Sequence, residues 1–172
     1  MTKDTVNETE RLVVTRVFDA PRALVWKAWT DPKYVAQWWG PKDFTSPVCK
    51  MDFRGGGKFL FCMRAPDGQE VWSGGEYHEI VVHEKIVYSM YFADTEGNKV
   101  EAAQYGIGHE AMDDAHDVII FEDFGNGQTK LTLIGNESME SAKNSGQVEG
   151  WNQILDKVAA VVAGLAGDKG RA

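Results

Sequence analysis

The four histidines are the residues whose chemistry is most versatile at neutral pH. They are His78, His83, His109 and His116. The segment HEAMDDAHD begins at His109 and ends beyond His116, so these two imidazoles are seven residues apart. Zinc-peptidase helices carry two His residues four apart, which places both rings on one metal. Because the spacing differs and the apolar pattern here is too weak for a helix, we expect an exposed acidic loop, with no metal and no cofactor.

No catalytic residue can be assigned. No Ser lies in the G-x-S-x-G turn of hydrolases. Cys49 and Cys62 have no neighbouring base and fall in strand-like segments, which predicts buried free thiols. The triplet Gly55–Gly57 lacks the Lys and Ser or Thr of a phosphate-binding loop. Glu122 and Asp123 are adjacent in a predicted strand, so their carboxylates point to opposite faces.

Composition restricts the partners. The net charge of −8 argues against nucleic acid and against anionic membranes, because both require clustered basic side chains. The chain shows neither an apolar leader nor a run of about 18 apolar residues, so a cytoplasmic location is expected. Six Trp, eight Phe and five Tyr are enough to fill a core or to line a ligand cavity.

The chain length predicts one domain over residues 1–172. After a first strand, Asp19 is expected to cap a helix that starts near Pro21. A second short helix follows Asp31-Pro32 and stops at Gly40-Pro41. The predicted strands are Arg11–Phe18, Val48–Phe53, Lys58–Arg64, Glu70–Val82, Ile86–Phe92, Ala115–Phe124 and Thr129–Gly135.

The segments between these elements contain residues that predict turns, bends and loops. Asn126-Gly127 predicts a tight hairpin, because both central residues of that turn need positive φ. The pair Gly74-Gly75 inside a predicted strand indicates a bulge or a sharp bend. The segment from Asp94 to Asp114 predicts a long loop or insertion, in which 101–105 forms a helical turn or a short strand.

The C-terminal segment is the most strongly periodic. Asn144 and Gln147 resemble a capping pair at the start of a helix of about 20 residues. Its wide apolar stripe includes Val148, Trp151, Leu155, Val158, Ala159 and Val162. A stripe this wide needs a large concave partner. The predicted fold class is therefore α+β: a curved antiparallel sheet of six to seven strands around a long helix, with two short helices after the first strand.

A cavity between sheet and helix would be lined by alternate residues of the strands, because side chains alternate faces with a period of two. Side-chain packing alone would explain the same pattern, and sequence does not separate the two. Aromatic and Met side chains in that pattern suit an apolar guest. The ligand-cavity residues predicted in this way are Phe61, Met63, Trp72, Tyr88, Met90, Trp151, Leu155 and Val158.

The order of these elements resembles that of the START-like, or Bet v 1-like, helix-grip superfamily. Four motifs resemble its branch named for the activator of the Hsp90 ATPase. They are the segment 16–29, Trp38-Trp39-Gly40-Pro41, the pair 75–80 and 84–88, and Gly150-Trp151 with Leu155 following. The similarity spans about residues 12–163. The longer segment 94–114, and Val81-Val82-His83 where prolines are frequent, depart from the family pattern.

The resemblance implies several functions, because fold similarity alone does not specify activity. The leading expectation is binding of a small apolar or aromatic molecule, without enzymatic turnover. One alternative is a co-chaperone-like module that binds an Hsp90-type chaperone. Another is a cyclase, aromatase or hydrolase that uses the same cavity, with Glu76, His78, Tyr88 and His116 as its candidate acids and bases. Exposed strand edges would also permit a homodimer.

Overall fold

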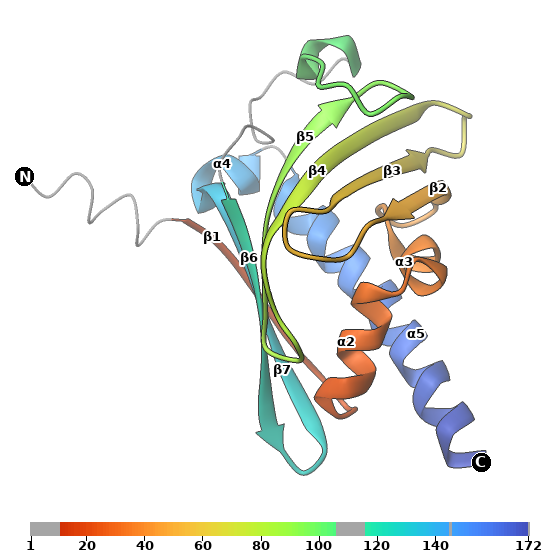
Figure 1. The fold of residues 1–172 in the computed structure, drawn as a ribbon, viewed down its shortest axis with the longest axis vertical. Helices are drawn as coiled ribbons and strands as arrows, with labels where there is room; N and C mark the ends of the chain where they lie inside the picture. The colour runs from red at the N-terminus through yellow and green to blue at the C-terminus, as the bar shows by residue number, and fades with distance from the viewer. Residues whose placement is uncertain (1–10, 106–115, 145, 172) are drawn as a thin grey trace, which may run out of the picture.

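A curved antiparallel sheet wraps around a long C-terminal helix in the computed structural model (Figure 1). The structure describes residues 11–105, 116–144 and 146–171. The sheet has seven strands in the described residues, in the order β1-β7-β6-β5-β4-β3-β2. The strands are β1 (Arg11–Phe18), β2 (Thr45–Met51), β3 (Lys58–Arg64), β4 (Glu70–Val81), β5 (Lys85–Ala93), β6 (His116–Gly125) and β7 (Gln128–Ser138).

The helices lie on the concave side of the sheet or at its ends (Figure 1). Two short helices follow β1, and the last helix closes the concave side. The helices are α2 (Arg22–Thr30), α3 (Pro32–Trp38), α4 (Met139–Asn144) and α5 (Gln147–Arg171), with a 3₁₀ turn η1 (Ala102–Tyr105). This architecture is the predicted α+β helix-grip fold.

The core lies where α5 meets the inner face of the sheet. Leu155 and Val158 of α5 are fully buried, as are Leu131 and Leu133 of β7. Burial of apolar side chains of this size contributes about 1.5–3 kcal/mol each. The α2–α3 pair is held by a hydrogen bond in which the indole N–H of Trp38 donates to the Ala28 carbonyl at 2.8 Å.

Two predicted connections are confirmed by their backbone geometry. Asn126 and Gly127 have φ values of 53° and 74°, as a tight hairpin with two positive φ residues requires. Asp31 caps α3, because its carboxylate accepts the N–H of Lys33 at 3.0 Å and Pro32 occupies the first turn.

Helix α2 begins next to Pro21, as predicted, but the two predicted helix caps are wrong. The residue before α2 is Pro21, and no side chain caps that helix, so Asp19 does not act as predicted. Asn144 ends the separate helix α4, and α5 begins at Gln147. Gly146 between the two helices has a φ of 81°, which breaks the helical path between them. Helix α4 was not predicted.

The predicted bulge at Gly74-Gly75 is also absent: β4 pairs through both residues, and its register shifts later, between Tyr77 and Glu79. Gly75 serves a different purpose, because a Cβ there would overlap the Ser89 carbonyl oxygen and the Phe59 ring. Omitting the side chain lets Phe59 lie against the backbone of β4.

The segment predicted as a long loop begins with local structure. Ala93 and Lys99 form an isolated antiparallel bridge, and 102–105 is the 3₁₀ turn η1. The hydroxyl of Tyr105 donates to the Ala93 carbonyl, which fastens η1 to the end of β5. His109 and the remainder of the HEAMDD stretch lie outside the described residues.

Candidate functional site

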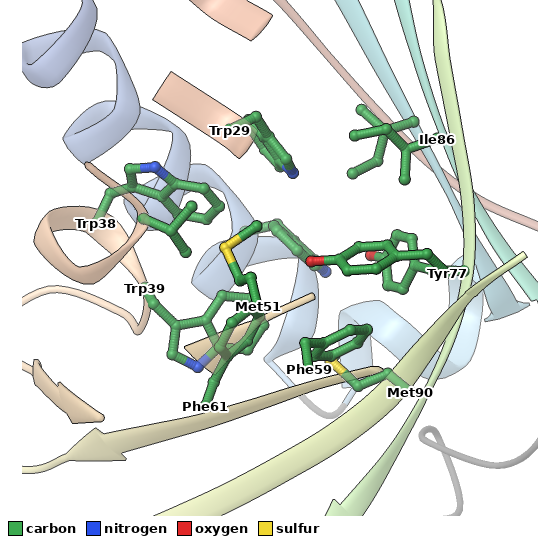
Figure 2. A pocket seen from close by; sticks show the side chains of 13 residues that line it. Trp29, Trp38, Trp39, Met51, Phe59, Phe61, Tyr77, Ile86 and Met90 are labelled. Carbon is green, nitrogen blue, oxygen red and sulfur yellow. The ribbon is translucent and has the colours of Figure 1, made fainter. Parts of the chain in front are cut away.

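An apolar pocket lies between the inner face of the sheet and helices α2, α3 and α5 (Figure 2). Its free volume is about 30 Å³. No charged side chain is among its lining residues. They are Trp29, Val35, Trp38, Trp39, Met51, Phe59, Phe61, Tyr77, Ile86, Tyr88, Met90, Ile119 and Trp151.

The side of the pocket nearest to solvent can be located from burial. Ten of the thirteen lining residues are buried, whereas Trp39, Met51 and Trp151 are only half-buried. These three side chains come from the end of α3, from the edge strand β2 and from the first turns of α5. A molecule that entered the pocket would therefore pass between these three elements.

Trp39 is positioned by the end of helix α3. Its backbone N–H donates to the Val35 carbonyl at 2.9 Å, which completes the last helical turn. Its indole ring lies 4.8 Å from the ring of Phe61 on β3, centroid to centroid. Phe61 in turn stacks on Phe59 at 4.8 Å. Aromatic contacts of this kind contribute about 0.5–1.5 kcal/mol beyond burial, so this wall of the pocket is ordered by ring packing.

The loop after Trp39 is fastened to helix α5 by a lysine. The Lys157 ammonium donates to the carbonyls of Gly40, Pro41 and Phe44 at 2.9, 3.3 and 3.2 Å. Burial lowers the pKa of Lys157, and the nearby Asp43 carboxylate opposes that effect. The three carbonyl oxygens replace the water that the ammonium loses on folding.

Replacing Lys157 by Met is expected to lower the free energy of unfolding by about 1–2 kcal/mol, because the carbonyl acceptors lose a charged donor while the apolar stem is kept. Urea denaturation followed by circular dichroism measures the change. Lys27→Met on α2 is the control, because that side chain is exposed and its ammonium lies 5.9 Å from the centre of the Tyr34 ring. Equal stabilities of the two variants would contradict this role of Lys157.

The polar groups of the pocket are uncharged. Burial raises the pKa of Tyr77, and burial together with the Asp117 carboxylate raises that of Tyr88. Both therefore present neutral hydroxyls at pH 7. Figure 2 shows the Tyr77 hydroxyl directed into the space between the rings.

The two cysteines are free thiols, as predicted: Cys62 is buried and Cys49 is half-buried. Burial raises the pKa of Cys49 to about 12 and, as the largest cause, that of Cys62 to about 11. Because the thiolate is the reactive form, neither cysteine has the character of a nucleophile.

The residues predicted to line a cavity separate into three groups. Phe61, Tyr88, Met90 and Trp151 do line the pocket. Leu155 and Val158 are fully buried in the core beside it. Two others lie apart from the pocket, and both are half-buried: Met63 and Trp72.

Strand geometry explains why Trp72 lies apart. Trp72 and Tyr77 are an odd number of residues apart on β4, so they face opposite sides of the sheet. The Trp72 indole N–H donates to the Glu70 carboxylate at 3.2 Å.

Several lining residues were missed by sequence reasoning. Trp29, Val35 and Trp38 lie in segments that were predicted only as two short helices. Their contribution to a pocket depends on how α2 and α3 pack over the sheet, which no local pattern encodes. Met51 on β2 could have been found, because Cys49 and Met51 alternate and pair with Phe61 and Phe59.

The candidate acids and bases of the enzyme alternative are not gathered in the pocket. Tyr88 lines it, whereas Glu76, His78 and His116 do not. His78 and His116 are exposed and contact each other. The described residues therefore show no acid–base pair within the pocket.

Within the described residues, no helix combines the length and the apolarity needed to span a bilayer.

The fold and pocket together define a class: a helix-grip domain with an aromatic space between its sheet and its helices. The profile of the family described as "Activator of Hsp90 ATPase homolog 1-like protein" matches residues 19–163. The chain therefore belongs to this family.

Solved structures with the same fold come from several bacteria. A protein from Arthrobacter aurescens has 24% identity and a TM-score of 0.75, over 91% of this chain and 87% of that one. A protein from Chromobacterium violaceum has 27% identity and a TM-score of 0.67, over 87% and 95%. The AHSA1 protein from Silicibacter pomeroyi has 21% identity and a TM-score of 0.69, over 88% and 96%. No match was found among curated proteins.

Proposed function

We propose that this protein binds a small apolar or aromatic molecule, without net charge, in the pocket between the sheet and helices α2, α3 and α5. The observation that carries the proposal is the lining: aromatic and aliphatic side chains with no charged group among them. An ionised ligand would lose its hydration without gaining a counter-charge there. The neutral hydroxyls of Tyr77 and Tyr88 can form hydrogen bonds with one polar group of a ligand.

The size of the pocket sets a condition on binding. A space of about 30 Å³ admits a water molecule but not a ligand, because small-molecule sites usually measure about 300–1,000 Å³. A ligand must therefore displace side chains, and the half-buried ones at the rim are displaced at the lowest cost. Met51 is the most adaptable of these, since it is unbranched and has three rotatable bonds. Figure 2 shows it among the aromatic rings.

Met51→Ala is expected to bind a neutral fluorescent probe, N-phenyl-1-naphthylamine, about tenfold more tightly than the wild type. The truncation opens space that the probe would otherwise have to clear, and about 1.4 kcal/mol corresponds to tenfold in affinity. Fluorescence titration measures the dissociation constant. Met63→Ala is the matched control, because Met63 is also half-buried but lies outside the pocket.

Two results would oppose the proposal. The first is that neither the wild type nor the Met51→Ala variant binds the probe. The other is an equal gain in affinity for Met51→Ala and Met63→Ala. Native mass spectrometry of freshly purified protein, compared with its denatured mass, would reveal a natural ligand as an extra mass that disappears on denaturation.

A further inference from the structure

The sheet carries a pair of stacked imidazoles outside the pocket. The ring centroids of His78 on β4 and His116 on β6 are 4.1 Å apart, with 25° between the ring planes. Both side chains are exposed. They meet above β5, where Ser89 pairs with His116 in register. The Ser89 hydroxyl oxygen lies 2.9 Å from Nε2 of His78.

The backbone positions both rings. The register of β4 against β5 shifts between Tyr77 and Glu79, which makes His78 the extra residue of a β-bulge. Bulges re-aim the side chain that they carry. At the other ring, the Arg11 guanidinium donates to the His116 carbonyl at 3.2 Å and holds the start of β6. The two Cα positions therefore belong to one hydrogen-bonded sheet rather than to independent loops.

We propose that His78 and His116 form a binding site for a divalent transition-metal ion of the kind that prefers imidazole ligands, such as Cu²⁺, Ni²⁺ or Zn²⁺. Imidazole nitrogen is the protein ligand that these ions share. Bringing one nitrogen of each ring to about 2.0–2.1 Å from a common ion requires only side-chain rotation. Because both rings are exposed, that rotation disturbs no core packing.

Ser89 supplies the hydrogen bond that usually holds the second ring nitrogen of a metal-binding histidine. A metal-bound His generally donates its other ring N–H to an oxygen, which fixes the tautomer and the ring orientation. When Nε2 of His78 donates to the Ser89 hydroxyl, the lone pair on Nδ1 is left for the ion. Ser89 is thus a positioning residue and not a ligand.

The remaining coordination positions belong to solvent. Within the described part of the chain, no three His, Cys, Asp or Glu side chains are grouped around one point. Glu76 on β4 pairs with Ser89 in register, so its carboxylate lies on the same face of the sheet as the Ser89 hydroxyl. Its charge, together with the net charge of −8, favours a cation at this face.

The test is a titration of the full-length protein with Cu²⁺ in a weakly coordinating buffer, followed by calorimetry and electron paramagnetic resonance. The wild type is expected to bind one equivalent with two nitrogen ligands in the spectrum. His78→Gln and His116→Gln are each expected to lose that saturable binding. Ser89→Ala is expected to weaken it about tenfold while keeping the two-nitrogen spectrum.

Two control variants make the result specific. His83→Gln removes an exposed imidazole whose ring lies against Trp26 at 5.9 Å. His109→Gln removes the remaining imidazole of the chain. Both are expected to bind Cu²⁺ as the wild type does, and circular dichroism verifies that every variant is folded. Wild-type binding by His78→Gln or by His116→Gln would overturn the proposal.

Discussion

Gly75→Ala is expected to lower the free energy of unfolding by about 3 kcal/mol, the largest effect anticipated for a single added methyl group. The added Cβ would overlap the backbone carbonyl oxygen of Ser89 and would lie 2.7 Å from Cε2 of Phe59. The carbonyl belongs to the β4–β5 ladder and cannot move without breaking strand pairing, and the Phe59 ring is buried. Urea denaturation followed by far-ultraviolet circular dichroism measures the change.

A second glycine provides the control. Gly164 lies in α5 and is exposed, and a Cβ added there would meet no side chain from another described element. Gly164→Ala is expected to stabilise the protein by about 0.5–1 kcal/mol, because Ala loses less backbone entropy in a helix than Gly does. If Gly75→Ala unfolded at the wild-type urea concentration, the close packing between β4 and the Phe59 ring would be refuted.

Leu155→Ala is expected to cost about 3 kcal/mol of stability and to leave the affinity for N-phenyl-1-naphthylamine within about threefold of the wild type. Leu155 is fully buried against the core, so its truncation creates a cavity. It does not line the pocket, although the sequence pattern places it there. Thermal unfolding measures the stability, and titration below the unfolding transition measures the affinity.

Trp151 gives the matching comparison one helical turn earlier. It lines the pocket and is half-buried, but its indole is a broad rigid surface that a bound probe would contact, whereas the flexible Met51 would be displaced. Trp151→Ala is therefore expected to weaken probe binding about tenfold through loss of aromatic contact. A Leu155→Ala variant that weakened binding as much as Trp151→Ala does would show that the pocket extends deeper along α5 than the lining residues indicate.

The predictability of the site differs from one element to the next. Phe61, Tyr88 and Met90 were assigned from alternation along single strands, and each lines the pocket. Trp72 was assigned in the same way and lies apart from it. The strand itself was correct, but the expected distortion at Gly74-Gly75 obscured which face Trp72 would take. The bulge formed at His78 instead, where no Gly or Pro marks it.

The apolar stripe of α5 likewise could not predict which of its residues line the pocket. Periodicity predicts that Trp151, Leu155 and Val158 share one face of α5, and burial agrees with that. Whether a residue on this face meets a pocket or solid core depends on what lies opposite. Leu155 and Val158 are fully buried, whereas Trp151 lies one turn nearer the start of α5 and is half-buried, at the open side of the pocket.

The sequence by itself determined the order and type of nearly all the elements, because hydrophobic period, turn residues and helix punctuation are local properties. It also indicated an interior rich in aromatic side chains and two buried free thiols. Only the tertiary structure decided which aromatic side chains surround one pocket, where the pocket approaches solvent, and that Lys157 fastens the loop after Trp39. It also brought His78 and His116 together across Ser89. These features join residues far apart in the chain, and their geometry depends on sheet curvature, bulge position and helix packing, which no single segment encodes.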